Sequence, residues 1–499
     1  MVNDSEIIGT NPWWRDAKSI EDDPEIVAWG RAKLRFIPGI MREITYDFEP
    51  DNTVVYTLRG TRQIGKTTLM KLQIRRFLED GIHPWNILYY SFDLCKTPRE
   101  LVDVMERYIW LAREVRDDGR RYIFLDEVST IPNWQKGIKW LVDRGRVANS
   151  TIMATGSDAI DLRRAVERLP GRRGSTLEPY DRVLLPLKFS EYAGALDPEI
   201  KAIIDSKLCF ENRLEIFVKL ANGEVDETVE HLYMYQDVLE GLLSKYMYSG
   251  GIPLVVSSQV SAWPIREDVY NSYMNSIIGE WSRLGRDPDL LKRLGREIVK
   301  SHGSLASWNG MAKSGDIGTY KTVQDSVQTL TDLFVLATFY RYDPGRKFPM
   351  FRRNKKIYFA DPFFFHLFNG WTATGNYFDT SAKYLASSEN RGALVESVVA
   401  GHLARLAFDA SPNKQNFDHR YRIFYYMEDG KEADFVYHDG DKVVVPIEVK
   451  YRNTARRSLA GMYKLLNRTR GKGLVVSKDH LGAYSEYVMV PAPVFLLLA

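Results

Sequence analysis

The chain has 499 residues, of which 44% are hydrophobic and 27% charged, with a formal net charge of +3. This length exceeds what one hydrophobic core usually fills, so we expect several domains, and the composition excludes a disordered chain. The near balance of charge neither favours nor excludes a polyanionic partner. The two cysteines are too few for a disulfide framework and fit the cytoplasm. No apolar run is long enough to span a bilayer, so we expect no membrane association.

The first part of the chain alternates between apolar runs and helical patterns. After an N-terminal segment, residues 1–50, the apolar runs that indicate strands lie at 53–59, 86–92, 122–128 and 150–157. A glycine-rich turn opens a helix after the first run, and helical patterns separate the others. This alternation predicts a parallel α/β sheet, and we assign residues 51–193 to it.

The rest of the chain changes character twice. Residues 194–287 carry helical patterns broken by YSGGIP, which predicts a helical lid. Residues 288–350 hold short helical patterns that lead into a strand, an order that suits a winged helix, although many small helical packings give the same pattern. Residues 351–390 connect this segment to a third module at 391–499, where one amphipathic helix precedes several strands. The predicted fold class is α/β throughout.

The sequence GTRQIGKT at 60–67 matches the phosphate-binding pattern G-x-x-x-x-G-K-[ST] between a predicted strand and a predicted helix. Backbone N–H groups of such a loop surround the phosphates of ATP; Lys66 would reach the β- and γ-phosphate oxygens, and the Thr67 hydroxyl would coordinate Mg²⁺. The alternative is a glycine turn that only caps a helix. The expected nucleotide-binding residues are Gly60, Thr61, Arg62, Gln63, Ile64, Gly65, Lys66, Thr67 and Thr68.

The run YIFLDEV supplies acidic residues at the carboxyl end of a predicted strand. Asp126 would face Mg²⁺, and Glu127 would orient and deprotonate the attacking water. That pattern is typical of hydrolysing ATPases in which one further strand separates the loop strand from the carboxylate strand. The alternative is an acidic pair that caps the next helix.

Two further positions would complete this site. Ser157 ends the next strand and would hydrogen-bond the γ-phosphate or water, with Thr155 as the competing choice. Arg172 and Arg173, in LPGRRGS, would supply the cation that neutralises charge in the transition state, including at the nucleotide of a neighbouring subunit. A trans-acting arginine requires a homo-oligomer. The alternative is a locally paired or solvated arginine.

The segment EADFVYHDGDKVVVPIEVK, residues 432–450, predicts a hairpin around an Asp-Gly turn. Glu448 and Lys450 are two apart on one strand, so both side chains leave the same face. Asp434 joins that face only if the connecting loop has an odd length, with Gly440 in a left-handed conformation, or if a bulge lies near Pro446. We expect that geometry. Asp434 and Glu448 would then bind a divalent cation, Lys450 would stabilise phosphate charge, and Glu396 on the preceding helix would be a further ligand.

The alternative for this hairpin is an edge strand with protective charges. The sequence that follows favours phosphate binding, because no acidic residue occurs between Val449 and Lys478. The basic residues of this interval are Lys450, Arg452, Arg456, Arg457, Lys464, Arg468, Arg470, Lys472 and Lys478. Such a local basic stretch suits a polynucleotide, although a solvated helix face explains the cations almost as well.

Taken together, the chain resembles a family of prokaryotic, largely archaeal, AAA-type ATPases fused to a C-terminal restriction-endonuclease-like domain of uncharacterised role. The motifs that carry the resemblance are NPWW, GTRQIGKTT, IFLDEV, ATGSDA, LPGRRGS with LLPLKFSEY, YSGGIP, KIYFADP, GALVESVVAGHL and EADFV with VPIEVK. The resemblance implies an ATPase core with a helical lid, a winged-helix segment and a nuclease-like fold of the Asp, Glu-x-Lys type. It places the nuclease-like positions at Glu396, Asp434, Glu448 and Lys450. Thr61 and Gln63 depart from the proline and arginine that relatives often carry.

Two functions of different class follow from these features. The first is a Mg²⁺-dependent ATP hydrolase that binds DNA and couples its nucleotide state to a metal-dependent nuclease-like domain, with Mn²⁺ as an alternative ion there and RNA as an alternative partner. The second is an ATP-dependent switch or scaffold that binds nucleic acid or protein without cleaving it. A salt bridge from Lys450 that closes the carboxylate site would favour the second.

Overall fold

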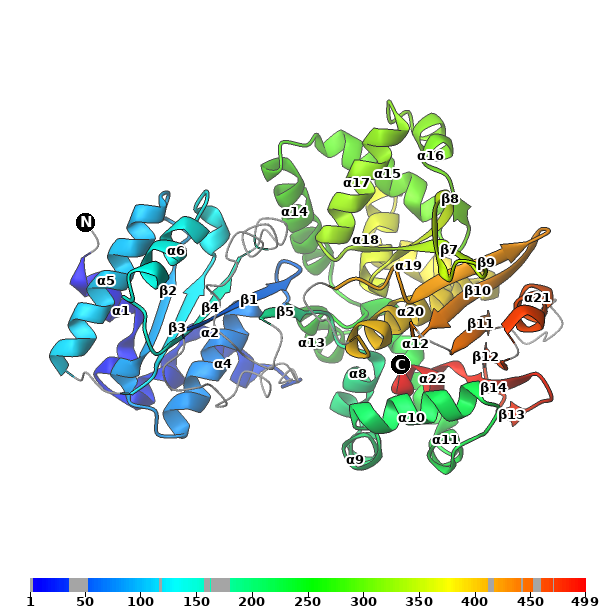
Figure 1. Ribbon diagram of the computed structural model, residues 1–499, viewed down its shortest axis with the longest axis horizontal. Coiled ribbons are helices and arrows are strands. Elements are labelled where there is room, and N and C mark those ends of the chain that lie inside the picture. The colour runs from blue at the N-terminus through cyan, green and yellow to red at the C-terminus, as the bar shows by residue number, and fades with distance from the viewer. Residues whose placement is uncertain are drawn as a thin grey trace. The chain divides into compact units, whose positions relative to one another are not determined.

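The structure is a computed structural model of the chain (Figure 1) and describes residues 3–35, 53–115, 119–156, 162, 180–411, 417–440, 443–451, 459–469 and 471–499. The chain forms two compact units, Met1–Leu185 and Pro186–Ala499. Within the described ranges, no helix has both the length and the apolar character needed to cross a membrane.

A five-stranded sheet forms the centre of the first unit. Its strands are β1 (Val54–Gly60), β2 (Ile87–Ser91), β3 (Arg121–Asp126), β4 (Ser150–Thr155) and β5 (Asp181–Leu184). They run parallel in the order β2-β3-β4-β1-β5. The connecting helices are α4 (Lys66–Glu79), α5 (Pro98–Val115) and α6 (Gln135–Asp143). The expected extra strand is β4, which separates the loop strand β1 from the carboxylate strand β3.

The N-terminal segment covers the edge strand β2. It contains α1 (Asp4–Thr10) and α2 (Pro24–Arg31), with NPWW between them. The Asn11 amide accepts a hydrogen bond from the Tyr89 N–H at 2.7 Å and donates to the Tyr89 carbonyl at 2.9 Å. The indoles of Trp13 and Trp14 both donate to the Ile87 carbonyl. An edge strand otherwise exposes unpaired backbone groups, so NPWW closes this side of the sheet.

The second unit begins with a layer of helices. They are α8 (Phe189–Leu196), α9 (Pro198–Lys207), α10 (Phe210–Ala221), α11 (Glu227–Tyr233), α12 (Gln236–Ser249), α13 (Pro253–Ser261) and α14 (Glu267–Arg283). Several of them pack on α18 (Pro362–Thr372) and α22 (Ala492–Leu498). The late apolar run VFLLLA forms most of α22, whose side chains are fully buried.

Three helices and three strands follow next along the chain. They are α15 (Pro288–Lys300), β6 (Leu305–Ala306), α16 (Trp308–Ser314), α17 (Tyr320–Asp332), β7 (Leu336–Asp343) and β8 (Phe348–Phe359). β8 pairs antiparallel with both β7 and β6. The expected boundary at residue 350 falls inside β8.

The remaining strands join the β7–β8 hairpin in one nine-stranded sheet, in the order β13-β14-β12-β11-β10-β9-β7-β8-β6 (Figure 1). They are β9 (Ile423–Glu428), β10 (Lys431–His438), β11 (Val444–Lys450), β12 (Gly473–Ser477), β13 (Gly482–Ala483) and β14 (Tyr487–Pro491). β7 runs parallel to β9 and makes the junction. The accompanying helices are α19 (Tyr377–Ala386), α20 (Ser388–Asp409) and α21 (Ala460–Thr469).

Several motifs of the family resemblance meet in the core of the second unit. The Leu187 N–H donates to the Gly251 carbonyl at 2.7 Å, and the Gly251 N–H donates to Asp361 Oδ2 at 2.8 Å. The Phe189 N–H donates to His402 Nε2 at 2.9 Å. A Cβ on Gly251 would lie 2.0 Å from the Leu187 carbonyl oxygen, so only glycine fits there. These hydrogen bonds therefore join LLPLKFSEY, YSGGIP, FADP and the GALVESVVAGHL segment of α20.

Candidate functional sites

The phosphate-binding loop of the first unit has the backbone that its sequence requires. Gly60 ends β1 and lies so close to the neighbouring strand β5 that a Cβ on Gly60 would lie 2.4 Å from the Leu184 carbonyl oxygen. Gln63 and Gly65 both have positive φ, 58° and 100°, which curls the chain before α4 begins at Lys66. The Lys66 ammonium is buried and donates to the loop's own carbonyls, at 3.3 Å from Gly60 O and 3.1 Å from Thr61 O.

Three hydroxyl groups hold the Asp126 carboxylate beside this loop. Thr67 Oγ1 donates to Asp126 Oδ2 at 2.7 Å, and the Tyr89 hydroxyl donates to the same oxygen at 3.0 Å. Thr155 Oγ1 donates to Oδ1. Burial, followed by the charge of Asp126, raises the pKa of Tyr89, so its hydroxyl remains a donor. Tyr89 was missed from the sequence because it appears there as one more aromatic residue of an apolar strand.

The pair formed by Thr67 and Asp126 fits a magnesium ion, which usually takes one or two protein ligands and completes its shell with phosphate oxygens and water. Glu127 follows Asp126 with a left-handed φ of 51°, and its N–H donates to Asp126 Oδ1 at 3.1 Å. The structure therefore brings together Lys66, Thr67, Asp126 and Glu127 at the carboxyl ends of β1 and β3.

The N-terminal segment also reaches the phosphate-binding helix α4. The Thr68 hydroxyl donates to Glu25 Oε2, and Lys71 Nζ lies 3.0 Å from Asp23 Oδ2. The Lys71 ammonium stands 3.4 Å from the centre of the Tyr89 ring. Burial lowers the pKa of Lys71, while the charge of Asp23 opposes that change. These acidic contacts on α4 gave no recognisable pattern in the sequence.

In the second unit, the hairpin of β10 and β11 has the register that an odd loop requires. Phe435 lies opposite Ile447, and five residues, 439–443, separate the paired His438 and Val444. Gly440 has a φ of 97°, as expected. β10 does have a register shift, but it lies in the pairing with β9, between Ala433 and Val436, and not near Pro446 of β11.

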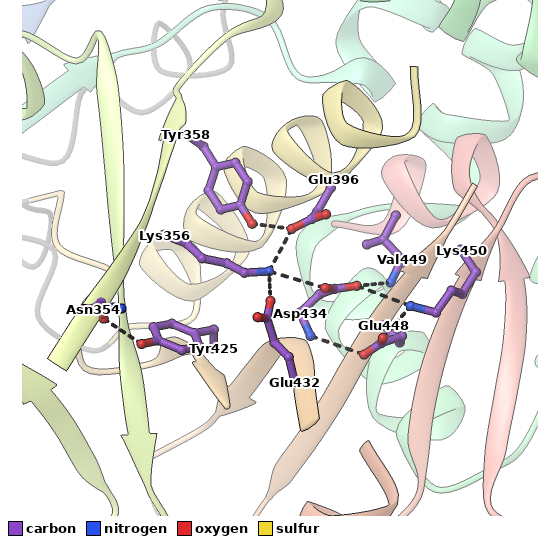
Figure 2. Close-up of polar contacts among 10 residues, drawn as sticks. All are labelled: Asn354, Lys356, Tyr358, Glu396, Tyr425, Glu432, Asp434, Glu448, Val449 and Lys450. Carbon is purple, nitrogen blue, oxygen red and sulfur yellow. Dashed lines mark hydrogen bonds and ion pairs between the residues drawn. The ribbon is translucent and has the colours of Figure 1, made fainter. Parts of the chain in front are cut away.

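This register puts Asp434 and Glu448 side by side. The Asp434 N–H donates to Glu448 Oε2 at 3.2 Å, and the Val449 N–H donates to Asp434 Oδ2 at 2.9 Å. Lys450 Nζ donates to Glu448 Oε1 and lies 3.9 Å from Asp434 Oδ2. Glu396, Asp434, Glu448 and Lys450 therefore lie in one cluster, in which a salt bridge joins Lys450 to Glu448 (Figure 2).

Lys356 of β8 occupies the middle of this cluster (Figure 2). Its ammonium lies 2.9 Å from Glu396 Oε1, 2.5 Å from Glu432 Oε1 and 3.3 Å from Asp434 Oδ1. Only 1% of the Lys356 side chain is exposed, and the Tyr358 hydroxyl donates to Glu396. Lys356 lies in residues 351–390, which the sequence analysis assigned only as a connecting segment, so its role was not predicted.

The surroundings of the cluster raise the pKa of its central cation and of two of its carboxyl groups. Burial alone would lower the pKa of Lys356, but the surrounding carboxylates, led by Glu396, raise it well above its usual value. Burial and the charge of Asp434 raise the pKa of Glu448 to about 8, against the opposing effect of Lys450. Burial likewise raises the pKa of Glu396. Lys356 is therefore a permanent cation in this cluster.

The cluster opens into a cavity of about 600 Å³ that is also lined by Lys300, His302 and Tyr384. Among the residues that the structure describes, no group of three or more His, Cys, Asp or Glu side chains has the arrangement of a metal site. The ammonium of Lys356 stands between the carboxylates that a divalent ion would need to bridge. This donor set does not fit the metal site that we expected of Glu396, Asp434 and Glu448.

Some expected positions fall outside the described residues. They are Ser157, Arg172, Arg173, Arg452, Arg456, Arg457 and Arg470. Thr155, the alternative to Ser157, instead contacts Asp126. Of the basic stretch that we expected to bind phosphates, Lys464 and Arg468 pair with Asp429 and Glu428.

Comparison with known families identifies the class of the first unit. Residues 52–193 match the model of an AAA domain. Residues 240–375 match a domain of unknown function (DUF8612), and residues 391–495 match another domain of unknown function (DUF4143). The chain therefore carries an AAA-type P-loop ATPase domain, together with two modules to which no function is attached.

Among individual proteins, an uncharacterized protein of Haemophilus influenzae (strain ATCC 51907 / DSM 11121 / KW20 / Rd) is 26% identical over 232 residues. That match covers 46% of each chain, so this chain spans about half the length of the curated relative.

The solved structures that are similar include the Walker-type ATPase of Pyrococcus abyssi, at 14% identity and a TM-score of 0.35, covering 67% of this chain and 96% of that one. The Orc1 protein of Aeropyrum pernix, solved in complex with DNA, has 14% identity, a TM-score of 0.25 and coverage of 70% and 92%. Cdc6p of Pyrobaculum aerophilum has 13% identity, a TM-score of 0.23 and coverage of 65% and 87%. At these TM-scores, the likenesses carry no functional argument.

Proposed function

We propose that the first unit hydrolyses ATP with Mg²⁺. The observation that supports this most is the contact of Thr67 with Asp126 at 2.7 Å, directly beside the loop that carries Lys66. Lys66 would bind the β- and γ-phosphate oxygens, and Thr67 with Asp126 would hold the ion. Mg²⁺ supplies charge neutralisation between the two phosphates. Glu127 would orient the attacking water and accept its proton.

Turnover of ATP by the full chain tests this proposal. We expect Lys66→Ala to reduce kcat by roughly 100-fold or more, because the variant lacks a preorganised cation at the transferring phosphate. Arg76→Ala is the matched control, since it removes a partly exposed cation of the same helix that pairs with Asp80 one turn away. Equal turnover by Lys66→Ala and the control would contradict the assignment.

For the second unit, we propose the non-cleaving alternative, in which this unit binds DNA without a nuclease reaction. Metal-dependent cleavage needs carboxylates that are free to coordinate an ion. Here Lys356 pairs with Glu396, Glu432 and Asp434, and Lys450 pairs with Glu448. The salt bridge of Lys450 is the feature that favours a switch or scaffold over a nuclease.

Incubation of DNA with the full chain and either Mg²⁺ or Mn²⁺ tests the absence of cleavage. We expect no ion-dependent cleavage by the unmodified protein, and none by Glu448→Gln. Cleavage that Glu448→Gln abolishes, while ATP turnover persists, would overturn the non-cleaving proposal and restore the nuclease hypothesis.

The order of the elements from α15 to β8 supports DNA binding by the second unit. Helix, strand, two helices and a two-stranded hairpin follow one another as they do in winged-helix domains. We further propose that ATP and ADP change the affinity of the chain for DNA. Fluorescence anisotropy of labelled DNA with each nucleotide tests this, and equal affinity with ATP, ADP and no nucleotide would contradict a switch. The role of Arg172 in a homo-oligomer stays a prediction.

A further inference from the structure

The pairing of β7 with β8 contains a register shift, so β8 has extra residues that form a bulge. Tyr340 lies opposite Lys355, yet the next residue, Arg341, lies opposite Met350. Residues 351–354, with the sequence FRRN, therefore have no partner on β7. All four are exposed, whereas the side chains of a regular strand alternate between two faces. Bulges of this kind redirect side chains away from a sheet.

The bulge is anchored to the sheet behind it. The buried Tyr425 of β9 donates its hydroxyl to the Asn354 carbonyl at 2.6 Å (Figure 2). On the other side of the bulge, the Lys355 ammonium lies over the Trp308 ring of α16, 4.7 Å from its centre. The outward position of residues 351–354 is therefore part of the folded structure.

Exposed aromatic rings surround this bulge. Phe351, Phe348 and Tyr421 are 39%, 48% and 49% exposed. Phe348 lies 6.1 Å from Phe351 and 5.5 Å from Tyr421, measured between ring centres, and Phe351 lies 6.3 Å from Tyr421. Contiguous exposed aromatic surface of this kind marks an interaction site. We call these three rings with Arg352 and Arg353 the aromatic bulge surface.

The positive charge of this surface favours an anionic partner. Residues 344–360 contain no Asp or Glu. The basic residues of that segment are Arg346, Lys347, Arg352, Arg353, Lys355 and Lys356. Arg352 and Arg353 form no ion pair with any residue of the described part of the chain. By contrast, α17, which corresponds to the base-reading helix of a winged helix, has only Lys321 as a cation and carries Asp325 and Asp332.

We propose that the aromatic bulge surface binds single-stranded DNA, with unpaired bases stacked on Phe348, Phe351 and Tyr421 and phosphates paired with Arg352 and Arg353. Aromatic rings bind bases through their faces, which a duplex hides except at its ends. Interleaved cations and exposed rings are the usual composition of single-strand surfaces. This inference rests on the proposal that the second unit binds DNA, and it names the surface and the form of DNA.

Anisotropy of a labelled thymidine oligonucleotide with the full chain tests the inference, with salt varied at each step. We expect Phe351→Ala and Tyr421→Ala each to weaken binding by roughly tenfold, because one base can no longer stack, with little change in the salt dependence. Arg352→Ala with Arg353→Ala should also weaken binding, and the slope of log K against log salt should flatten by roughly 0.7 for each phosphate that no longer has a cation beside it.

Matched controls separate this surface from general effects. Tyr484→Ala removes an aromatic ring that is 41% exposed at the far end of the sheet, and Lys136→Ala with Lys139→Ala removes two exposed cations of α6. We expect both controls to bind like the unmodified chain. Tyr425→Phe, which releases the Asn354 carbonyl, should give an intermediate loss of affinity without touching the partner.

The outcomes distinguish this inference from the proposed function. Binding of duplex or single-stranded DNA that none of the bulge variants weakens would overturn the inference and leave DNA binding intact. Absence of binding to any DNA would refute both. Binding of RNA of the same sequence without binding of DNA would overturn the assignment to DNA, and capture of an acidic protein in place of nucleic acid would overturn the partner class.

Discussion

Replacement of Lys356 by methionine offers the sharpest test of the carboxylate cluster. Methionine has a similar length but no charge, so Glu396, Glu432 and Asp434 would lose the ammonium that lies 2.5 to 3.3 Å from their oxygens. Removal of one partner of a buried ion pair typically costs about 3–5 kcal/mol, because the remaining charge is uncompensated. Two of the three carboxylates are at most 14% exposed, so we expect a loss of stability in this range.

Urea denaturation of the full chain, followed by circular dichroism and tryptophan fluorescence, measures this loss. The matched control is Lys355→Met, one residue away, where the ammonium contacts the Trp308 ring and forms no ion pair with a carboxylate in the described part of the chain. The control should cost about 1 kcal/mol, the value of an ordinary cation–π contact. The difference between the two variants isolates the charge of the cluster.

The response to divalent ions extends the same test. If the Lys356 ammonium takes the place of an ion, millimolar Mg²⁺ or Mn²⁺ should leave the second unit of the unmodified chain unchanged in stability. The same ions should stabilise Lys356→Met, because a ligand that binds only the folded state raises its stability. A Lys356→Met variant as stable as the control, or an unmodified chain whose second unit Mn²⁺ stabilises, would refute this reasoning.

Three further results are expected. Tyr89→Phe should raise the Mg²⁺ concentration needed for half-maximal ATP turnover several-fold with the fold intact, because Asp126 loses one of its donors; an unchanged magnesium requirement would assign Tyr89 a packing role only. Gly251→Ala should lower the denaturation midpoint, because its Cβ would overlap the Leu187 carbonyl; an unshifted midpoint would contradict the close approach. The second unit should lose stability as pH falls below 6.5. Burial lowers the pKa of four of its histidines, to about 3 for His302 and His402 and to about 4 for His366 and His419. Since these groups take up protons only on unfolding, each lowers the free energy of unfolding by about 1.4 kcal/mol per pH unit between 6.5 and its folded value. Denaturation midpoints that are equal at pH 7 and pH 5.5 would contradict that sign.

Local patterns in the sequence were sufficient to predict that the residues of the proposed nucleotide site come together. The loop at Gly60 to Thr67, the acidic pair after an apolar run and the extra strand between them all depend on short-range signals, and the structure brings them together. The odd loop that puts Asp434 beside Glu448 also followed from the parity of a single hairpin. These features need only a few neighbouring residues to define them.

Partners that are distant in the sequence were not predictable in this way. Lys356 lies 40 residues from Glu396 and 78 from Asp434, and only the pairing of β7 with β9 brings its strand to the cluster. Tyr89 and Thr155 reach Asp126 from separate strands. One signal was available and overlooked. Two lysines directly precede the apolar run IYF, and a charge in a buried strand requires a partner of opposite charge.

The internal position of Lys356 also decides how β8 can align with its neighbours. In the observed pairing, Lys356 lies opposite Phe339 and its ammonium reaches the three acids. A slip of one residue that put Ile357 at this position would present only hydrocarbon to those acids. The bulge ends at Asn354, two residues before Lys356. The alignment of β8 with β7 therefore also determines which side chains of β8 point into solvent. The buried ion pairs of Lys356 thereby determine which residues of β8 are exposed on the surface of the protein.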